Sequence, residues 1–329
     1  MKYINYVSGY ENQIYDLYCD FQKEDDFYKA MSYEEFSWNL FKNPSFQPEG
    51  TFLALNDDEV VGFGGAIVRP SDLESPTAPG FIHTFIVKKE FRRQGIGSKL
   101  LELCEEYIKS KGRTSARFVF VSPINWPWYI PNTDHHLHPG APAIRINSDM
   151  YIFLYHHNYF VNGIHEGFHL PLSEYQLPEK VVKKMEANKE RGLFVEIYDP
   201  NKHYGVEEFC QKIEKSNAGF ARAIRNNLKR EQPYPFLCAN ENGRMVGWTG
   251  AIWNESSGRG HFDGIIVDED IRKAGLGTGL FCYLCYQSKL NGAKYMTFFT
   301  GLDNPARYIY LGAGFKIAQS FADMKKKFD

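Results

Sequence analysis

Two turns with the same spacing of basic and glycine residues occur in the sequence, Arg92-Arg93-Gln94-Gly95-Ile96-Gly97 and Arg272-Lys273-Ala274-Gly275-Leu276-Gly277. Each follows an apolar segment, which ends at Val87 or Val267. Glycines remove Cβ atoms and so allow a phosphate to approach the backbone closely. If a helix begins at each turn, its first amide groups and its dipole favour an anion there. The two turns therefore predict two sites for a phosphate or diphosphate group.

Both turns lie inside a longer internal repeat. Three pairs of segments match in the same chain order: 60–67 with 245–252, 87–101 with 267–281, and 115–122 with 293–300. A repeat that keeps its order over this length indicates a duplicated domain rather than one accidental motif. The Pro-rich stretch 69–80 accounts for the extra residues between the first two matched segments of copy one.

The elements that position the turns follow from periodicity and turn residues. The second copy predicts a strand at 193–199, helices at 203–215 and 218–230, a hairpin at 235–253, a strand at 264–270, a helix after 277 and a strand at 295–301. Asn242-Gly243 is a favoured two-residue hairpin turn. Each copy is predicted to be a mixed α/β domain on one sheet. The expected boundaries are 1–175 for the first domain, 176–191 for a charged helical connector and 192–329 for the second domain.

The composition excludes several classes of protein. The 329 residues are 43% hydrophobic and 24% charged, which is ordinary for a globular chain. Because 38 Lys and Arg nearly balance 40 Asp and Glu, we expect no nucleic-acid partner. No run of about 18 apolar residues is present, and the N-terminal segment lacks a signal-peptide pattern, so we expect no membrane partner. Six cysteines in this length fit a reducing cytoplasm.

The two turns resemble motif A of the GNAT superfamily, the Gcn5-related N-acetyltransferases, whose signature is Q/R-x-x-G-x-G/A. Over nearly its whole length the chain resembles two-domain GNAT proteins of the mycothiol synthase kind. This implies an α/β (α+β type) fold of two tandem domains, each a mixed, mostly antiparallel sheet flanked by helices. In that family the turn holds the pyrophosphate of acetyl-coenzyme A (acetyl-CoA), and the preceding strand holds the pantetheine arm. The resemblance implies these cofactor-binding residues: Phe85, Ile86, Val87, Arg92, Arg93, Gln94, Gly95, Ile96, Gly97 and Ser98 in the first copy, and Ile265, Ile266, Val267, Arg272, Lys273, Ala274, Gly275, Leu276, Gly277, Thr278 and Asn304 in the second.

A dinucleotide-binding fold is the competing interpretation of the glycines. Its G-x-G-x-x-G motif needs a third glycine that the second copy has one residue too early, at Gly279. The first copy has Lys99 at the matching place, and neither turn opens its domain as a Rossmann turn does. The phosphate site of the GNAT type is therefore favoured.

Acetyl transfer to an amine needs a proton acceptor for the amine and a partner for the leaving thiolate. Removing the proton of a lysine-like amine costs about 4–5 kcal/mol at pH 7, and a carboxylate or His can accept it. Asp263, four residues before Val267, is the candidate catalytic base. The resemblance places Tyr310 where GNAT enzymes have a Tyr facing the coenzyme sulfur, five residues before the Phe of a Gly-Phe pair.

The first copy departs from this catalytic pattern. Aligning Asn158-Tyr159 with the Gly-Phe pair puts Leu154 at the position of the Tyr, and aligning Gly167-Phe168 puts Gly163 there. At the position of the base the first copy has His83. We therefore expect catalysis in the C-terminal domain, whereas the N-terminal domain keeps only its predicted coenzyme turn.

A Pro-rich, aromatic insertion between Ser122 and Leu154 distinguishes the first copy. Its residues Trp126, Trp128 and Tyr129 argue against disorder. Long insertions in compact domains are usually functional or disordered. Two interpretations stay open, a cover or acceptor pocket and plain packing.

Histidines and cysteines raise two further possibilities, a metal site and a redox pair. The histidines concerned are His135, His136, His138, His156 and His157. Their spacing fits no standard site and no cysteine lies nearby, so no metal is expected. Cys282 and Cys285, one turn apart in the expected helix, are interpreted as small core residues.

The sequence thus predicts an N-acetyltransferase that moves an acetyl group from acetyl-CoA directly to the amine of a small-molecule acceptor. Two alternatives remain, a peptide or protein N-acetyltransferase and a non-catalytic coenzyme-binding sensor or scaffold. The sequence favours no oligomeric state and no particular acceptor.

Overall fold

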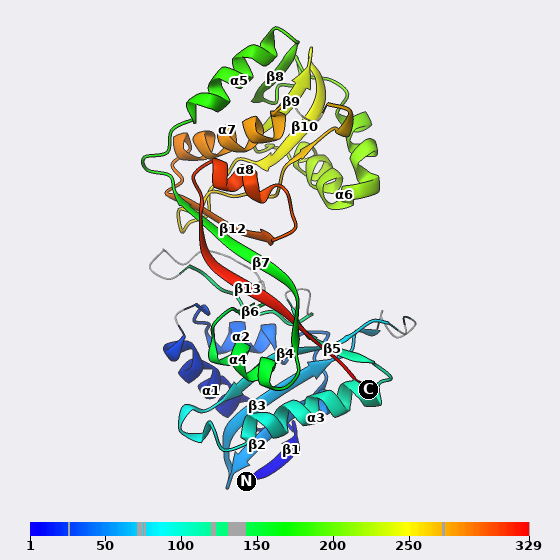
Figure 1. Ribbon diagram of the computed structural model, residues 1–329, viewed down its shortest axis with the longest axis vertical. Helices are drawn as coiled ribbons and strands as arrows, with labels where there is room; N and C mark the ends of the chain where they lie inside the picture. Colours follow the sequence, from blue (N-terminus) through cyan, green and yellow to red (C-terminus); the bar gives the residue numbers. More distant parts are fainter. Residues whose placement is uncertain are drawn as a thin grey trace. The chain divides into compact units, whose positions relative to one another are not determined.

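The computed structural model describes residues 1–328 except 26, 71–74, 76, 120–122, 131–142 and 272–273. It divides the chain into two compact units. Unit 1 contains Met1–Gly167 together with Gln319–Asp329, and unit 2 contains Phe168–Ala318. Figure 1 shows that each unit combines a sheet with helices, so the predicted duplicated α/β architecture is confirmed.

Unit 1 begins with a strand and two helices and ends on strands from two distant parts of the chain. Its elements are β1 (Lys2–Asn5), α1 (Glu11–Glu24), α2 (Tyr33–Asn39), β2 (Thr51–Asn56), β3 (Glu59–Ile67), β4 (Gly80–Val87), α3 (Ile96–Ser110), β5 (Ser115–Phe118), β6 (Ile144–Arg145), α4 (Asp149–His156), β7 (Phe160–Pro171) up to Gly167, and β13 (Lys316–Lys327) from Gln319. The strand order is β1-β2-β3-β4-β5-β13-β7. Among the described ladders of this unit only the β4–β5 pair is parallel, so the sheet is mixed and mostly antiparallel, as predicted.

Unit 2 repeats the same order of elements. They are the end of β7 from Phe168, α5 (Glu179–Lys189), β8 (Leu193–Ile197), α6 (Val206–Leu228), β9 (Phe236–Glu241), β10 (Arg244–Ala251), β11 (Ile266–Val267), α7 (Leu276–Leu290), β12 (Tyr295–Gly301), α8 (Arg307–Gly312) and the start of β13. Four antiparallel strands lie in the order β11-β10-β9-β8, and β12 is a neighbour of β7. Short 3₁₀ turns, Lys89–Phe91 and Glu269–Ile271, follow β4 and β11 in the two units.

The strand registers of the two units correspond residue by residue. In unit 1 Gly62 pairs with Val87, and in unit 2 the equivalent Gly247 pairs with Val267. The predicted hairpin turn is also present, with positive φ at Asn242 (48°). The strand expected at 264–270 is shorter than predicted, because Gly264 has φ of 136° and the chain enters the 3₁₀ turn soon after β11.

The compact units divide the chain at other positions than the boundaries proposed from the repeat. The predicted connector contains α5, which lies inside unit 2, and the final strand β13 belongs to unit 1 from Gln319 onward. In unit 1 Met324 pairs with Phe118 of β5, and Phe321 and Met324 are fully buried. Because a repeat in sequence shows which segments are homologous and not which unit a strand joins, this exchange was not predicted.

Hydrophobic clusters hold helices against both faces of each sheet. In unit 1 Leu100 of α3 and Leu17 of α1 belong to separate buried clusters. In unit 2 Leu280 of α7 and Ile213 of α6 do so. Helices α3 and α7, which begin at the glycine turns, are thus fixed by one apolar face.

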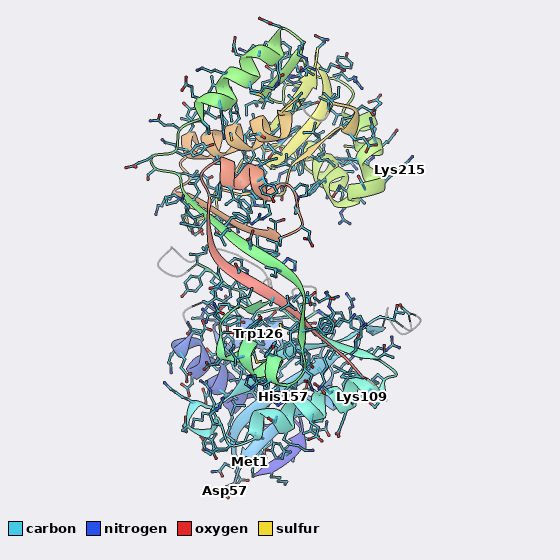
Figure 2. All side chains as sticks on the ribbon, in the orientation of Figure 1. Met1, Asp57, Lys109, Trp126, His157 and Lys215 are labelled. Carbon is cyan, nitrogen blue, oxygen red and sulfur yellow. The ribbon has the colours of Figure 1, made fainter. Side chains whose placement is uncertain are left out.

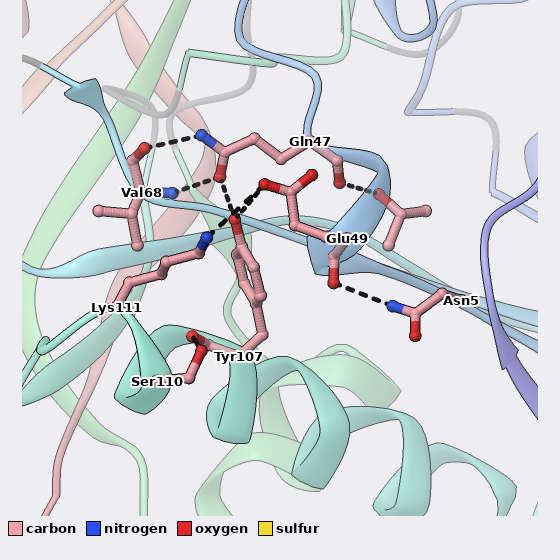
Figure 3. A network of polar contacts seen from close by, with 8 residues as sticks. Asn5, Gln47, Glu49, Val68, Tyr107, Ser110 and Lys111 are labelled. Carbon is pink, nitrogen blue, oxygen red and sulfur yellow. Dashed lines mark hydrogen bonds and ion pairs between the residues drawn. The ribbon is translucent and has the colours of Figure 1, made fainter.

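A polar network also anchors the far end of α3 (Figure 3). The Tyr107 hydroxyl donates to Gln47 Oε1 (2.8 Å), and the Gln47 side chain bonds both backbone groups of Val68 (2.9 Å each). Lys111 lies 3.7 Å from Glu49. Since α3 is held at its C-terminal end, the direction of its N-terminal amide groups is fixed as well. In the described part of the chain no helix is long and apolar enough to cross a membrane.

Candidate active site

The two glycine turns begin the helices with bare amide groups. Gly95 and Gly275 are the N-cap residues of α3 and α7, with φ of 80° and 77°, and neither helix has a side-chain cap. The first intrahelical bonds run from Lys99 to Gly95 and from Gly279 to Gly275. Three amide groups at the start of each helix precede these bonds, which is the arrangement that binds phosphate groups at helix N-termini.

The turn of unit 1 is open above its N-cap. A Cβ atom at Gly95 would meet no atom of the described chain within 4 Å. The Arg92 side chain is held by the Val87 carbonyl (Nε to O, 2.8 Å) and by Glu24 (2.8 Å). Arg92 therefore fixes the turn, while Arg93 and Gln94 are exposed beside it. Their predicted contacts with coenzyme, like those of the rest of the turn, stay predictions.

The turn of unit 2 has helix α5 beside it. Lys184 Cγ lies 3.4 Å and Met185 Cε 3.9 Å from the position that a Cβ atom on Gly275 would take. Asn188 Nδ2 donates to the Ala274 carbonyl (2.9 Å). Lys184 is exposed, so α5 brings a positive charge to the turn that the motif did not predict. The predicted residues Arg272 and Lys273 lie outside the described residues.

The strand before each turn separates from its neighbour and leaves its edge without a ladder partner. In unit 1 β4 pairs with β5 only at Gly80 and Phe81, so Phe85, Ile86 and Val87 lie beyond the paired part. In unit 2 no described pairing joins β11, which holds Ile266 and Val267, to β12. Unpaired main-chain groups on these edges are available to a ligand that lies between the strands, although the Val87 carbonyl is already held by Arg92.

Tyr310 lies in α8 and packs into an aromatic cluster of unit 2. Its ring is 4.7 Å from Phe298, 4.8 Å from Phe281 and 5.9 Å from Phe262 between centroids, and the residue is 5% exposed. Burial raises the pKa of Tyr310 to about 12, so the hydroxyl stays protonated near neutral pH. A protonated phenol can donate a hydrogen bond to a leaving thiolate, but Tyr310 is also a core residue, and its catalytic role stays a prediction.

Asp263, the predicted base, follows Phe262, whose ring packs against Tyr310. The Asp263 carboxylate accepts a hydrogen bond from His261 Nε2 (Oδ1, 2.7 Å), and its Oδ2 lies 3.5 Å from the Ala251 amide. Both side chains are partly exposed, so water and an acceptor can reach them.

The matching position in unit 1 holds a partly buried histidine, His83. The β3–β4 register skips His83, because Gly65 pairs with Thr84 and Ala66 with Ile82. A Cβ atom on Gly65 would lie 2.5 Å from the His83 ring, and one on the equivalent Gly250 would lie 3.1 Å from Asp263 Cβ. In both units a glycine thus makes room for the residue at the predicted base position.

His83 is unsuited to remove protons. Thr84 Oγ1 lies 2.6 Å from His83 Nδ1, and Nε2 is buried without a partner among the described residues. Burial lowers the pKa of His83 to about 3, so the ring stays neutral. The Trp126 indole donates to the His83 carbonyl (3.1 Å) and to Thr84 Oγ1 (3.0 Å).

The insertion of copy one packs where β4 and β5 separate. A cavity of about 60 Å³ there is lined by Ile82 and His83 of β4, by Phe118 of β5 and by Trp126 of the insertion. Trp128 of the insertion is fully buried. The described part of the insertion therefore packs into unit 1, the unit to which it belongs.

Helix α4 reaches the turn of unit 1 as α8 reaches the turn of unit 2. Phe153 lies 3.4 Å from the position of a Cβ atom on Gly97, and Ile309 lies 3.6 Å from that on Gly277. His157 Nε2 lies 2.9 Å from Ser98 Oγ (His157 is labelled in Figure 2 with Trp126). Because Phe153 and Ile309 correspond, the alignment that sets the fully buried Leu154 against Tyr310 is favoured over the one that uses Gly163.

The remaining candidates from the sequence are Asn304, the histidines of the possible metal site and the cysteine pair. Asn304 Nδ2 donates to Thr300 Oγ1 (2.8 Å), and its Oδ1 accepts from the Ala306 amide (3.0 Å), so its side chain closes the turn before α8. His135, His136 and His138 lie outside the described residues. Cys282 and Cys285 are buried free thiols, and burial raises the pKa of both.

Sequence reasoning missed His261 and Lys184. His261 lies two residues from Asp263, a spacing that brings two side chains to one side of an extended segment, and this could have found it. Lys184 belongs to a segment treated as a connector, and no local pattern indicates that its helix packs beside a distant turn.

Comparison with known proteins gives one family and no curated relative. The model of the acetyltransferase (GNAT) family matches residues 12–125 and 194–315, and no curated protein matches. A GCN5-related glucosamine N-acetyltransferase region of a fungal multi-domain β-N-acetylglucosaminidase is similar over 99% of this chain at 12% identity and a TM-score of 0.64, although the chain spans only 38% of that protein.

Two further solved structures are similar over nearly the full length of both chains. A GCN5-related N-acetyltransferase from Sphaerobacter thermophilus has 15% identity and a TM-score of 0.58, with 99% of this chain and 95% of that chain covered. A tandem GNAT protein from the clavulanic acid biosynthesis pathway has 14% identity and a TM-score of 0.53, with 99% and 98% covered. With a family match in each of its two units, the chain belongs to the GNAT acetyltransferase family and has the tandem GNAT fold.

Proposed function

We propose that the chain is an N-acetyltransferase that moves the acetyl group of acetyl-CoA directly to the amine of a small molecule, with the chemistry in unit 2. The observation that supports the proposal is the strand β11 without a described partner on its outer edge, which leads into the bare amide groups of α7, together with the packing of Tyr310 in the same apolar cluster as Ile265 and Val267. The diphosphate of coenzyme A fits such a turn, and its acyl end would follow the strand edge toward Asp263.

The atoms of the proposed reaction balance without a further reagent. The acceptor ammonium loses one proton at the Asp263–His261 pair, and the neutral amine attacks the thioester carbonyl. A C–N bond forms and the C–S bond breaks, while the Tyr310 hydroxyl donates a hydrogen bond to the departing thiolate. The second amine proton passes to the thiolate, which leaves as free coenzyme A. Positioning of the two substrates supplies a large share of the acceleration, up to about 7–11 kcal/mol.

Two observations support a small-molecule acceptor. A stacked aromatic column of Tyr234, Trp253 and His261 lies next to Asp263. Such a surface suits a compact amine, whereas a peptide acceptor would call for an extended acidic groove. One neighbour is named as a glucosamine N-acetyltransferase region, and that name concerns an amino sugar. All six cysteines are free, which agrees with our proposal that the protein works in the cytoplasm.

Release of free coenzyme A tests the proposal. The chain is incubated with acetyl-CoA and a panel of small primary amines, and a peptide with a free N-terminus is included. We expect release with at least one small amine and an acetylated amine in the mass spectrum. Release with the peptide alone would favour the protein N-acetyltransferase, and coenzyme binding without any release would favour the sensor.

A further inference from the structure

In unit 2 the Asp263 carboxylate is hydrogen-bonded to one defined nitrogen of the His261 imidazole, Nε2. A carboxylate oxygen only accepts hydrogen bonds, so His261 Nε2, 2.7 Å from Asp263 Oδ1, must carry a hydrogen. In a neutral imidazole the other nitrogen then holds a free lone pair. No described residue is recorded as a hydrogen-bond partner of His261 Nδ1. The pair thus presents a basic nitrogen, held in one tautomer.

The orientation of the His261 ring is also fixed, by stacking on a neighbouring aromatic ring. The Trp253 ring stacks on it with centroids 4.4 Å apart and an interplanar angle of 26°, and the His261 amide donates to the Trp253 carbonyl (3.0 Å). Beyond Trp253 lies Tyr234 at 6.0 Å, with the Arg230 guanidinium 4.5 Å over the Tyr234 ring. Asp263, the Tyr234 phenol and the Arg230 guanidinium are the titratable and charged groups recorded along this column.

The loop that carries the pair is anchored by a buried ion pair. Arg259 binds Glu255 (2.8 Å) and donates from Nε to the Thr297 carbonyl (3.0 Å), and both members of the ion pair are almost fully buried. The Gly260 amide donates to the Tyr295 carbonyl (2.8 Å). A buried ion pair is costly to break, so the residues that follow Gly260 are held in place.

We propose that His261 is the general base of the acetyl transfer, and that Asp263 is the positioning residue that selects its tautomer. The assignment rests on the proposed function. A free imidazole is a stronger base than a free aspartate by about 2.6 pKa units, which favours proton transfer to it by about 400-fold. Asp263 already accepts the His261 hydrogen bond and stabilises the imidazolium that forms. The imidazolium then returns its proton to solvent.

Substitution of each member separates the two roles. In His261→Gln the amide can still donate to Asp263 but cannot accept a proton, so kcat for coenzyme A release with acetyl-CoA and a small amine should fall by about 10²–10⁴-fold. Asp263→Asn should lose a comparable factor, and the double variant should be no worse than either single one, because the residues act as a unit. His156→Gln, an exposed histidine of α4, is the matched control and should match the wild type.

A pH profile gives a readout that a structural role would not move. In the wild type the profile of kcat should have an acidic limb on which activity falls as the pH is lowered, and this limb should be absent from the residual activity of His261→Gln. If His261→Gln keeps kcat within threefold and keeps the limb, Asp263 itself is the base and the assignment is overturned.

Nitrogen NMR of the histidine side chains keeps this inference separate from the proposed function. We expect the Nε2–H tautomer for His261 in the wild type, and its loss in Asp263→Asn. An Nδ1–H tautomer in the wild type would overturn the assignment, even in an active enzyme. If the wild type releases no coenzyme A with any amine, the proposed function fails, and the tautomer still decides whether the pair is built as described.

Discussion

The two units keep the same glycine turn and differ in what surrounds it. At the turn of unit 1 Arg92 is bound to Glu24, and farther back along β4 Trp126 is bound to the His83 carbonyl. In unit 2 the exposed Lys184 lies beside the turn, and the partly exposed His261–Asp263 pair precedes β11. A duplicated fold can thus retain its helix-start amide groups in both copies while only one copy retains groups that accept or donate protons near the strand edge.

The largest expected effect comes from a negative charge at each turn. Gly97 and Gly277 suit this test better than the N-cap glycines, whose positive φ strains any other residue. A carboxylate about 4 Å from a phosphate costs about 4 kcal/mol at an effective dielectric of 20, or roughly 10³-fold in affinity. We expect Gly277→Glu to lower turnover by about 10³-fold and Gly97→Glu to leave it unchanged, with one coenzyme site lost in calorimetry in each case.

Alanine at the same positions is the control for these variants. A Cβ atom at Gly277 would lie 3.6 Å from Ile309, which is an ordinary contact, so Gly277→Ala should bind coenzyme A nearly as the wild type does. Equal loss of turnover in Gly97→Glu and Gly277→Glu would end the distinction between a catalytic and a non-catalytic unit.

A second prediction concerns the strand that unit 1 takes from the end of the chain. Met324 of β13 is fully buried in the core of unit 1. Met324→Ala should lower the free energy of unfolding of unit 1 by about 2–5 kcal/mol, because it removes buried methylene groups and leaves a cavity. Met296→Ala, at an equally buried site of unit 2, is the matched variant. Hydrogen exchange should show faster opening in unit 1 for the first variant and in unit 2 for the second.

A third prediction concerns the Tyr310 hydroxyl, which the proposed function assigns to catalysis in unit 2. Tyr310→Phe keeps the ring that packs on Phe281 and Phe298 and removes only the hydroxyl. Losing a hydrogen bond to a charged thiolate should cost about 1.5–3 kcal/mol, so kcat should fall by roughly 10–150-fold with an unchanged melting temperature. An unchanged kcat would return Tyr310 to a purely structural role.

The smallest effect is a pH dependence of the stability of unit 1. Burial lowers the pKa of His83 to about 3, against about 6.5 for a free imidazole. Below pH 6.5 the unfolded chain therefore binds a proton that the folded unit does not, and stability falls as the pH drops toward 3. Between pH 7 and 5.5 the loss relative to His83→Gln should be about 1.2 kcal/mol in denaturant titrations. Above pH 7 the difference between the two curves should be constant.

Much of the fold was predictable because its determinants are local. Glycine spacing and apolar periodicity predicted the turns at Gly95 and Gly275 and the helices that follow them. The hairpin at Asn242-Gly243 was predictable for the same reason. Even the break in α6, where Asn217 has non-helical φ and ψ, agrees with the two helices expected there.

The unpredicted features depend on contacts between residues far apart in the chain. The burial of His83 depends on Gly65 and on Trp126 from the insertion, so its sequence position alone predicted only a possible base. The fixed position of the His261–Asp263 pair depends on the buried Glu255–Arg259 ion pair. The place of β13 in unit 1 depends on pairing with β5, and no local pattern encodes that choice.

That place of β13 sets an order of events during synthesis. Residues Gln319 onward complete the sheet of unit 1, yet they leave the ribosome after every residue of unit 2. At about 5–20 residues per second, unit 1 waits for tens of seconds or less with an uncovered β5 edge, while unit 2 can already close. The half that is made first is therefore the half that finishes folding last, and until β13 arrives its β5 edge is open to pairing with another chain.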